Sequence, residues 1–241
     1  MMITKYVIKG LHWLLPNRCL WCTLPVHLPQ QQLCSACQRV LPEFDMVFYH
    51  GNLLWLPAVQ RGLPKLQAER LVSLSWYQQP WKLAITQWKF KQDLAAGQWL
   101  LSCFAERAQD YQAAGFPVPD LLTYIPMPKQ RQRQRGFNQA ELLARTLADV
   151  WQRPVVALLS RNDLNRQQLR LDRSKRLRNL RHAFQVEAVH QPQIIQAESI
   201  ALVDDVITTG STMRFACQAL KQAGASNIQL WTLAITESTA R

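Results

Sequence analysis

The chain has 241 residues, with 28 Lys plus Arg against 16 Asp plus Glu and a net charge of +12. Apolar residues make up 48%, which excludes a disordered basic tail and is enough to bury a core. No apolar run approaches the ~20 residues of a membrane-spanning helix, and residues 1–16 lack a signal-peptide pattern. We therefore expect a cytoplasmic protein with no membrane span and an anionic partner.

The N-terminal part combines a short amphipathic helix, expected at residues 1–16, with a cysteine module at residues 17–50. Two C-x-x-C pairs stand in this module, Cys19 with Cys22 and Cys34 with Cys37. Such pairs can place four thiolates around one tetrahedral Zn²⁺. The alternative, disulfides, is disfavoured in a reducing cytosol. With four thiolates the coordination is closed, so this zinc would be structural.

The middle of the chain is predicted to be mainly helical. We expect a loop at residues 51–70, a strand at 71–77, and helices at 81–91 and 93–114. Several tryptophans fall here, which would suit a partner-binding adaptor, but large aromatic residues in such a stretch more often pack a core.

Beyond Pro119, strands alternate with helices. Strands are expected at residues 121–125, 155–159, 183–186, 199–203 and 227–234, and helices at 139–151 and 211–223. This alternation predicts βαβ units and a mainly parallel sheet.

The positive charge is concentrated in one segment of this part. Residues 129–181 carry 14 basic and four acidic side chains, whereas residues 182–241 carry three basic and five acidic ones. Clustered charge attracts polyanions, so a nucleic acid or a small ligand rich in phosphate would fit. A merely solubilising face is the alternative.

The string Ala201-Leu-Val-Asp-Asp-Val-Ile-Thr-Thr-Gly-Ser-Thr-Met213 joins an apolar strand to a helix through a hydroxyl-rich turn. In a parallel sheet, the carboxyl ends of strands face the ligand. Gly210 lets the backbone approach an anion, and the first N–H groups of the next helix attract negative charge. Hydroxyl donors come from Thr208, Thr209, Ser211 and Thr212.

Two adjacent carboxylates, Asp204 and Asp205, precede this turn and can accept hydrogen bonds from vicinal sugar hydroxyls. The string therefore predicts a site for a phosphorylated ribose. A helix capped by Ser or Thr after a buried strand is the alternative. Two Asp residues in that position would carry a large desolvation penalty unless water or a ligand contacted their carboxylates.

This string resembles the signature of type I phosphoribosyltransferases, which bind phosphoribosyl pyrophosphate (PRPP) with Mg²⁺. Together with the cysteine pairs and Arg135-Gly-Phe-Asn-Gln139-Ala-Glu-Leu-Leu143, nearly the whole chain resembles the ComF/GntX family. Further matches occur in family order at Gln168, Leu171, Arg178, Asn179, Ala183 and Phe184. Relatives often carry more cysteines in the N-terminal module, whereas this chain has none between Cys37 and Cys103.

The resemblance implies roles for several segments. Asp204 and Asp205 would hold the ribose hydroxyls and are the catalytic candidates, while residues 208–212 would hold the 5′-phosphate. Residues 126–129 would bind pyrophosphate, and the basic stretch 161–181 corresponds to the hood loop that closes over the site. The candidates for cationic contacts to pyrophosphate are Lys129, Arg135, Arg173 and Arg176.

The resemblance also implies a role in DNA uptake or the use of external DNA as a nutrient, with DNA-uptake proteins as partners. In an extended segment, Lys129, Arg131, Arg133 and Arg135 would share one face and could track the phosphates of single-stranded DNA. Alternatively, these cations serve pyrophosphate alone, in an active phosphoribosyltransferase that transfers to a base or amine acceptor.

We therefore expect an α/β protein in three parts. These are a zinc-binding, ribbon-like module at residues 1–56, a mainly helical connector at 57–115, and a parallel-sheet domain of the type I phosphoribosyltransferase fold at 116–241. The expected ligands are structural zinc and, with Mg²⁺, PRPP or a related phosphoribosyl compound.

Overall fold

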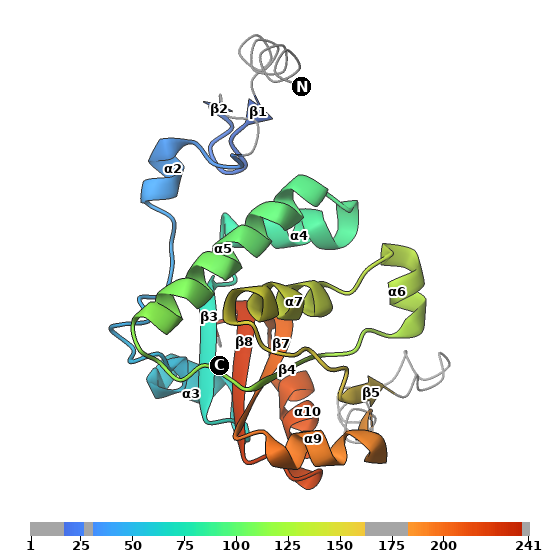
Figure 1. Cartoon of the computed structure of the whole chain (residues 1–241). Helices are drawn as coiled ribbons and strands as arrows, with labels where there is room; N and C mark the ends of the chain where they lie inside the picture. The colour runs from blue at the N-terminus through green and yellow to red at the C-terminus, as the bar shows by residue number, and fades with distance from the viewer. Residues whose placement is uncertain (1–16, 27–30, 162–182, 238–241) are drawn as a thin grey trace.

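The computed structural model describes residues 17–26, 31–161 and 183–237, arranged around a central four-stranded sheet (Figure 1). The strand order is β3-β8-β7-β4, and all three strand pairs are parallel. The strands are β3 (Arg70–Trp76), β4 (Leu121–Tyr124), β7 (Ser199–Ile207) and β8 (Asn227–Ile235). The predicted parallel α/β class is confirmed, and the carboxyl ends of the strands meet at one edge of the sheet.

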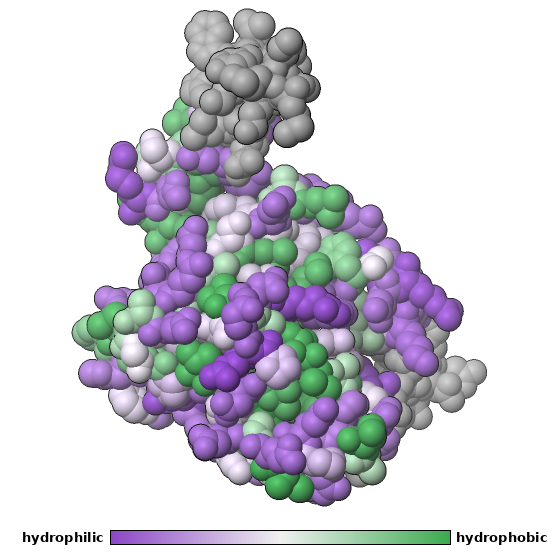
Figure 2. Space-filling view, viewed as in Figure 1, coloured by the Kyte–Doolittle hydropathy of each residue, from purple (hydrophilic) through white to green (hydrophobic). Residues whose placement is uncertain are grey.

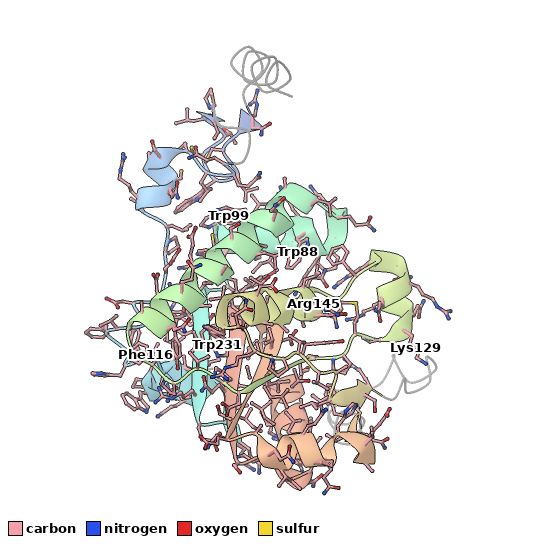
Figure 3. The ribbon with its side chains drawn as sticks, viewed as in Figure 1. Trp88, Trp99, Phe116, Lys129, Arg145 and Trp231 are labelled. Carbon is pink, nitrogen blue, oxygen red and sulfur yellow. The ribbon has the colours of Figure 1, made fainter. Side chains whose placement is uncertain are left out.

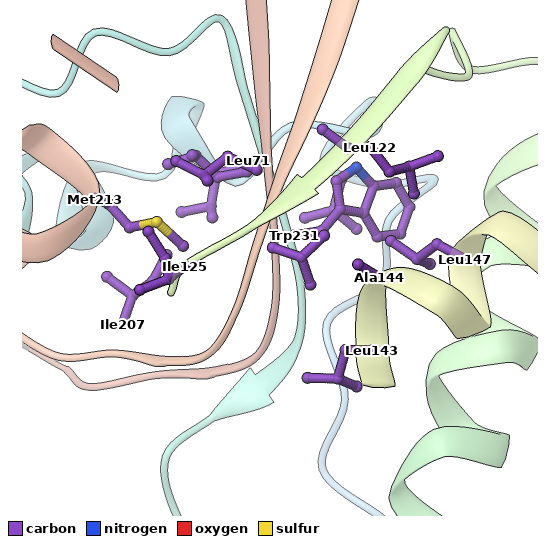
Figure 4. Close-up of a cluster of buried hydrophobic side chains, with 14 of the residues drawn as sticks. Leu71, Leu122, Ile125, Leu143, Ala144, Leu147, Ile207, Met213 and Trp231 are labelled. Carbon is purple, nitrogen blue, oxygen red and sulfur yellow. The ribbon is translucent and has the colours of Figure 1, made fainter. Parts of the chain in front are cut away.

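Helices cover both faces of the sheet, as a buried parallel sheet requires. On one face lie α5 (Leu94–Ala113) and α7 (Gln139–Trp151), with α4 (Trp81–Lys91) packed against α5. On the other lies α10 (Ser211–Gln222). Figure 4 shows the apolar side chains of α7 and α10 on opposite sides of the strands.

Trp231 of β8 anchors the face that α5 and α7 cover. Its ring meets those of Phe104, Tyr111 and Trp151 edge-on, with ring centroids 6.0, 4.9 and 4.8 Å apart. Edge-to-face contacts of this kind add to the free energy of burial. These aromatic contacts therefore hold α5 and α7 against β8.

The N-terminal module has its own small core. The strands β1 (Asn17–Arg18) and β2 (Pro25–Val26) pair antiparallel, and α2 (Ser35–Arg39) follows them. Trp99 of α5 packs against this core and stacks on Trp81, with ring centroids 5.0 Å apart. This tryptophan pair therefore packs the interior, as expected.

Several short elements complete the described fold. They are η1 (Leu53–Trp55), α3 (Pro57–Gly62), α6 (Lys129–Arg135), β5 (Leu159–Arg161), β6 (Phe184–Val186), η3 (Ala188–His190) and α9 (Gln191–Gln196). The predicted loop at 51–70 is wrong in part, because Pro57 begins a helix at a position where its missing N–H is not needed.

The strand predicted at 155–159 is also wrong in part. Val155 forms a single bridge to Leu122 of β4, and the N–H of Leu158 then bonds to the hydroxyl of Thr123 over 3.2 Å. The same N–H also donates to the carbonyl of Val156 over 2.9 Å, so the chain turns here instead of continuing the ladder to β4, and only Leu159 of the predicted strand belongs to β5.

The connector expected at residues 57–115 supplies β3, which pairs with β8 in the central sheet. The boundaries of the three parts stay predictions, and the helix expected at 1–16 lies outside the described residues. None of the helices in the described ranges has the length and apolar character needed to traverse a bilayer.

Candidate functional site

Asp204 and Asp205 lie near the carboxyl end of β7. The strand runs past its predicted end at Val203 to Ile207, because its pairing with β8 continues. Asp204 pairs in register with Thr232, whose hydroxyl donates to the carbonyl of Asp205 over 2.9 Å. The ladder to β8 thus positions both carboxyl groups at the edge of the sheet.

Lys89 of α4 meets this acidic pair. Its Nζ lies 2.7 Å from Oδ1 of Asp205, and only 16% and 13% of the two side chains are exposed. Water screens so buried a pair weakly. Sequence reasoning missed Lys89, because nothing in the pattern of α4 separates it from Lys82 or Lys91.

Asp204 does not ionise freely. Burial and the neighbouring Asp205 raise the pKa of Asp204 to about 7, although Lys89, the N–H of Asp205 and Arg161 act in the opposite direction. That N–H donates to Oδ1 of Asp204 over 2.8 Å. Near neutral pH, Asp204 is therefore partly protonated and can both donate and accept a hydrogen bond.

The predicted phosphate loop, residues 208–212, joins β7 to α10. Gly210 is the N-cap of α10 and has a φ of +68°. A Cβ there would lie 2.6 Å from Cδ2 of Leu63, so only glycine fits without displacing that side chain. No side chain of the described residues caps this helix, which leaves its first N–H groups pointing at the place where an anion would bind.

Hydroxyl groups surround the same helix start. The Oγ1 of Thr209 lies 3.1 Å from the Oγ of Ser211. Thr208 and Thr209 are exposed, and Ser211 and Thr212 are half-buried. The loop therefore presents backbone and hydroxyl donors immediately after the two carboxyl groups, an arrangement that can hold a phosphate beside a sugar.

Arg135 lies at the end of α6 and faces the same acidic pair. Its guanidinium carbon is 5.1 Å from the centroid of the Phe90 ring, and its Nη1 donates to Oε1 of Gln139 over 3.3 Å. Burial lowers the pKa of Arg135, and Asp205 acts against this effect. The charge of Arg135 thus lies within range of Asp205.

The rest of the Arg135 motif fixes the chain around the site. Phe137 stacks on Trp88 of α4 with centroids 5.8 Å apart, and Figure 3 shows Trp88 between α4 and the start of α7. Asn138 accepts from the N–H of Ala140 as the N-cap of α7, and its Nδ2 donates to the carbonyl of Ile125 over 3.1 Å. This residue therefore ties α7 to the loop after β4.

The basic row in α6 is helical, so the prediction of an extended segment with all four cations on one face is wrong. Pro128 and Gly136, with a φ of +81°, stand at the two caps of this helix. Residues two apart on a helix point about 200° apart, so Lys129 and Arg133 face one way, and Arg131 and Arg135 the other.

The cations of α6 differ in exposure. Lys129, Arg131 and Arg133 are exposed, whereas Arg135 is half-buried. Lys129 lies at the outer start of the helix (Figure 3), and hydrophilic residues cover the surface over α6 (Figure 2). The helix therefore presents a basic surface next to the acidic pair.

Two predicted contacts, Arg173 and Arg176, lie outside the described residues, as does most of the predicted hood loop. Its first residue, Arg161, is described. Its guanidinium lies over the ring of Phe184, 5.5 Å from the centroid, and its charge lowers the pKa of Asp204. The basic segment thus begins close to the acidic pair.

The four cysteines of the N-terminal module converge, with their Sγ atoms all within 4.8 Å of one another. Cys22 and Cys34 are 3.6 Å apart at sulfur, close to the ~3.8 Å edge of a tetrahedron with Zn–S bonds of ~2.3 Å. Cys19, Cys22, Cys34 and Cys37 are all free thiols and form no disulfide.

The four thiols differ in acidity, because burial raises the pKa of Cys37 to about 12. Burial acts to raise the pKa of Cys19, but N–H groups of Cys22, Cys34 and Trp21 that donate to its sulfur lower the pKa to about 6. A thiolate is the form that binds zinc. The donor set fits a closed structural site, and the described residues contain no second group of this kind.

Proteins of known name match the chain over most of its length. The DNA utilization protein YhgH of Salmonella typhi is 31% identical over 234 residues, which cover 92% of this chain and 98% of that protein. Competence protein F of Haemophilus influenzae is 29% identical over 222 residues, covering 90% and 96%. No family model matches the chain.

A solved structure of a glutamine PRPP amidotransferase from B. subtilis, complexed with ADP and GMP, covers 54% of this chain and 25% of its own. Its TM-score is 0.38 and its identity 18%, a likeness too slight to carry weight. The YhgH protein, in contrast, aligns at 31% identity over nearly the full length of both chains. The chain therefore belongs to the ComF/GntX family of DNA-utilisation and competence proteins.

Proposed function

We propose that this chain binds PRPP or a related phosphoribosyl ligand with Mg²⁺, in the cytoplasm, as part of a pathway that takes up or uses DNA. One observation carries the proposal. The carboxyl groups of Asp204 and Asp205 and the donors of residues 208–212 follow one another at the end of β7, while Lys89 faces them from α4. The names of the relatives supply the pathway.

Each part of the site has a distinct task in this proposal. The N–H groups at the start of α10 and the hydroxyls of residues 208–212 hold the 5′-phosphate, because they lie where the helix dipole favours negative charge. Asp204 and Asp205 accept hydrogen bonds from the ribose hydroxyls, and Lys89 fixes the carboxylate of Asp205. Mg²⁺ bound with PRPP neutralises pyrophosphate, and Arg135 adds a protein cation. Four cysteines hold a structural zinc.

Calorimetry with PRPP and Mg²⁺ on zinc-loaded protein tests the proposal. The wild type should bind, and the double variant Asp204→Asn, Asp205→Asn should bind about 10- to 100-fold more weakly, because the Asn oxygens still accept hydrogen bonds but each bond loses the roughly 1 kcal/mol by which a charged acceptor exceeds a neutral one. Asp149→Asn, at an exposed position of α7, is the matched control. No binding by the wild type, or equal binding by all three proteins, would overturn the proposal.

Contact with single-stranded DNA is a second function, favoured by the exposed cations of α6 beside the site. A salt titration of oligonucleotide binding measures it. The double variant Lys129→Ala, Arg133→Ala, which removes the two exposed cations that share one face of α6, should reduce the log–log slope by about 1.4, at about 0.7 per phosphate contact. Arg153→Ala, exposed after α7, should leave the slope unchanged. A flat slope in the wild type would exclude this contact.

Turnover is the alternative to binding alone, favoured by the partly protonated Asp204 at the centre of the site. A group with a pKa near 7 suits general acid–base catalysis. Release of pyrophosphate from PRPP with a base or amine acceptor, lost in Asp204→Asn, would identify an active phosphoribosyltransferase. No release with any acceptor would leave a ligand-binding protein.

A further inference from the structure

We propose that the last turn of α4 adds a nucleobase position to this site, with the ring of Phe90 as its stacking surface. The ligand class would then be a free nucleoside 5′-monophosphate, held by its base as well as by its phosphoribosyl group. This inference deepens the proposed function and rests on it.

Phe90 projects into solvent from the last turn of α4. Its side chain is 70% exposed, whereas Ile85 and Trp88 of the same helix are buried. The ring therefore contributes little to the core. The ring is therefore free to stack on a planar group, as the aromatic side chains that line ligand sites do.

The position of Phe90 links it to the acidic pair. Its neighbour Lys89 reaches Asp205 over 2.7 Å. The guanidinium of Arg135 lies 5.1 Å from the centre of the Phe90 ring, and the pKa of Arg135 responds to Asp205. Arg135 therefore connects the ring to the carboxylate that would hold the ribose, and Lys89 brings the last turn of α4 to the same carboxylate.

The ring is carried by a well-anchored turn. Trp88 stacks on Phe137, and Nε2 of Gln92, just after α4, donates to the carbonyl of Gln134 over 3.2 Å. These contacts tie the end of α4 to α6 and to the chain that follows it. A surface held in place in this way loses little freedom when a ligand stacks on it.

The chemistry of the surroundings favours a base over an aliphatic group. Arg135 lies against one side of the Phe90 ring. Because 70% of the Phe90 side chain is exposed, a planar base can stack on the rest of this ring. Aromatic stacking accepts every base, because every base has a π-face. The guanidinium of Arg135 can also contact the base edge or stack with it.

The acidic pair favours a free nucleotide over an internal residue of DNA. Carboxylates accept hydrogen bonds from sugar hydroxyls, but the 3′-oxygen of an internal nucleotide is esterified and cannot donate. Its phosphodiester would also bring a negative charge towards Asp205. The same base stacking would serve either ligand, so an oligonucleotide is the comparison that separates the two.

The test measures binding of ribose 5-phosphate, AMP and a 5′-phosphorylated single-stranded oligonucleotide to zinc-loaded protein by calorimetry. The wild type should bind AMP more tightly than ribose 5-phosphate. Phe90→Ala should weaken AMP binding about 5- to 150-fold, the range for loss of one base–aromatic stack, and change ribose 5-phosphate binding less than about twofold. Phe90→Trp should retain AMP binding.

Phe48→Ala is the matched control. Phe48 is 72% exposed, and its segment between α2 and η1 lies on the opposite side of the molecule from α6 (Figure 1). This variant should bind all three ligands as the wild type does.

The outcomes separate this inference from the function on which it rests. If neither ribose 5-phosphate nor AMP binds to the wild type, the proposed phosphoribosyl site fails. If ribose 5-phosphate binds but AMP binds no more tightly, or if Phe90→Ala weakens both ligands equally, only the base position fails. Binding of the oligonucleotide alone, lost in Phe90→Ala, would assign the ring to DNA and overturn the free-nucleotide class.

Discussion

Replacing Asp204 by Asn should stabilise the protein at neutral and alkaline pH. Burial and the Asp205 carboxylate raise the pKa of Asp204 from 3.8 to about 7, so the folded chain holds this proton more tightly than the unfolded chain. The resulting stabilisation is present below about pH 4 and is lost as the pH rises through about 7. The difference between the two pKa values corresponds to about 4 kcal/mol. This is the free energy by which ionisation of Asp204 destabilises the folded state. Asn removes the charge and keeps Oδ1, which accepts from the N–H of Asp205.

Urea unfolding followed by tryptophan fluorescence, with zinc present throughout, measures this effect. The stability of Asp204→Asn relative to the wild type should rise from about 2 kcal/mol at about pH 5 to about 4 kcal/mol at about pH 8. Asp149→Asn, at an exposed position, should show no such pH-dependent difference. A difference that stays constant with pH, or a variant less stable than the wild type at about pH 8, would refute this reasoning.

Three further predictions concern the surroundings of the site and the zinc module. Lys89→Met should destabilise the fold by about 3 kcal/mol in urea unfolding, because it leaves a buried carboxylate unpaired; equal stability of Lys89→Met and the exposed control Lys91→Met would contradict this. Zinc analysis should find one ion per chain in the wild type and in Cys103→Ser but much less in Cys22→Ser, and equal zinc in all three would rule out the four-cysteine site. Gly210→Ala should destabilise by about 1–2 kcal/mol, since alanine resists a positive φ, and should weaken PRPP binding; an unchanged melting temperature would show that the loop relaxes.

The parts of the site that are contiguous in the chain could be predicted from the sequence, and the rest could not. The acidic pair and residues 208–212 form one string whose strand, turn and helix follow from local chemistry. Lys89 lies more than a hundred residues upstream, and no local rule connects it to Asp205. Only the packing of α4 on α5 and of α5 on the sheet brings the two side chains together.

The basic row shows how an alternating pattern can mislead. Lys, Arg and Gln all form helices readily, so the alternation of charged and neutral residues in α6 says little about its backbone. The caps decide the outcome, since Pro128 precedes the helix and Gly136 adopts the left-handed conformation that ends it. As a result Arg131 and Arg135 share one face, on which Arg135 is half-buried and interacts with Asp205, while Lys129 and Arg133 share another.

The strand–loop–helix string alone would make a poor site for a phosphorylated sugar, because two carboxyl groups repel phosphate. The fold corrects this by bringing cations from three other elements. Lys89 comes from α4, Arg135 from α6 and Arg161 from β5, and each acts on Asp204 or Asp205. Two carboxyl groups carry at most two negative charges, so these three cations outnumber them even when both are ionised. Arg135 and Arg161 belong to the basic segment 129–181, so in the proposed function part of its positive charge offsets the acidic strand end and favours an anionic ligand.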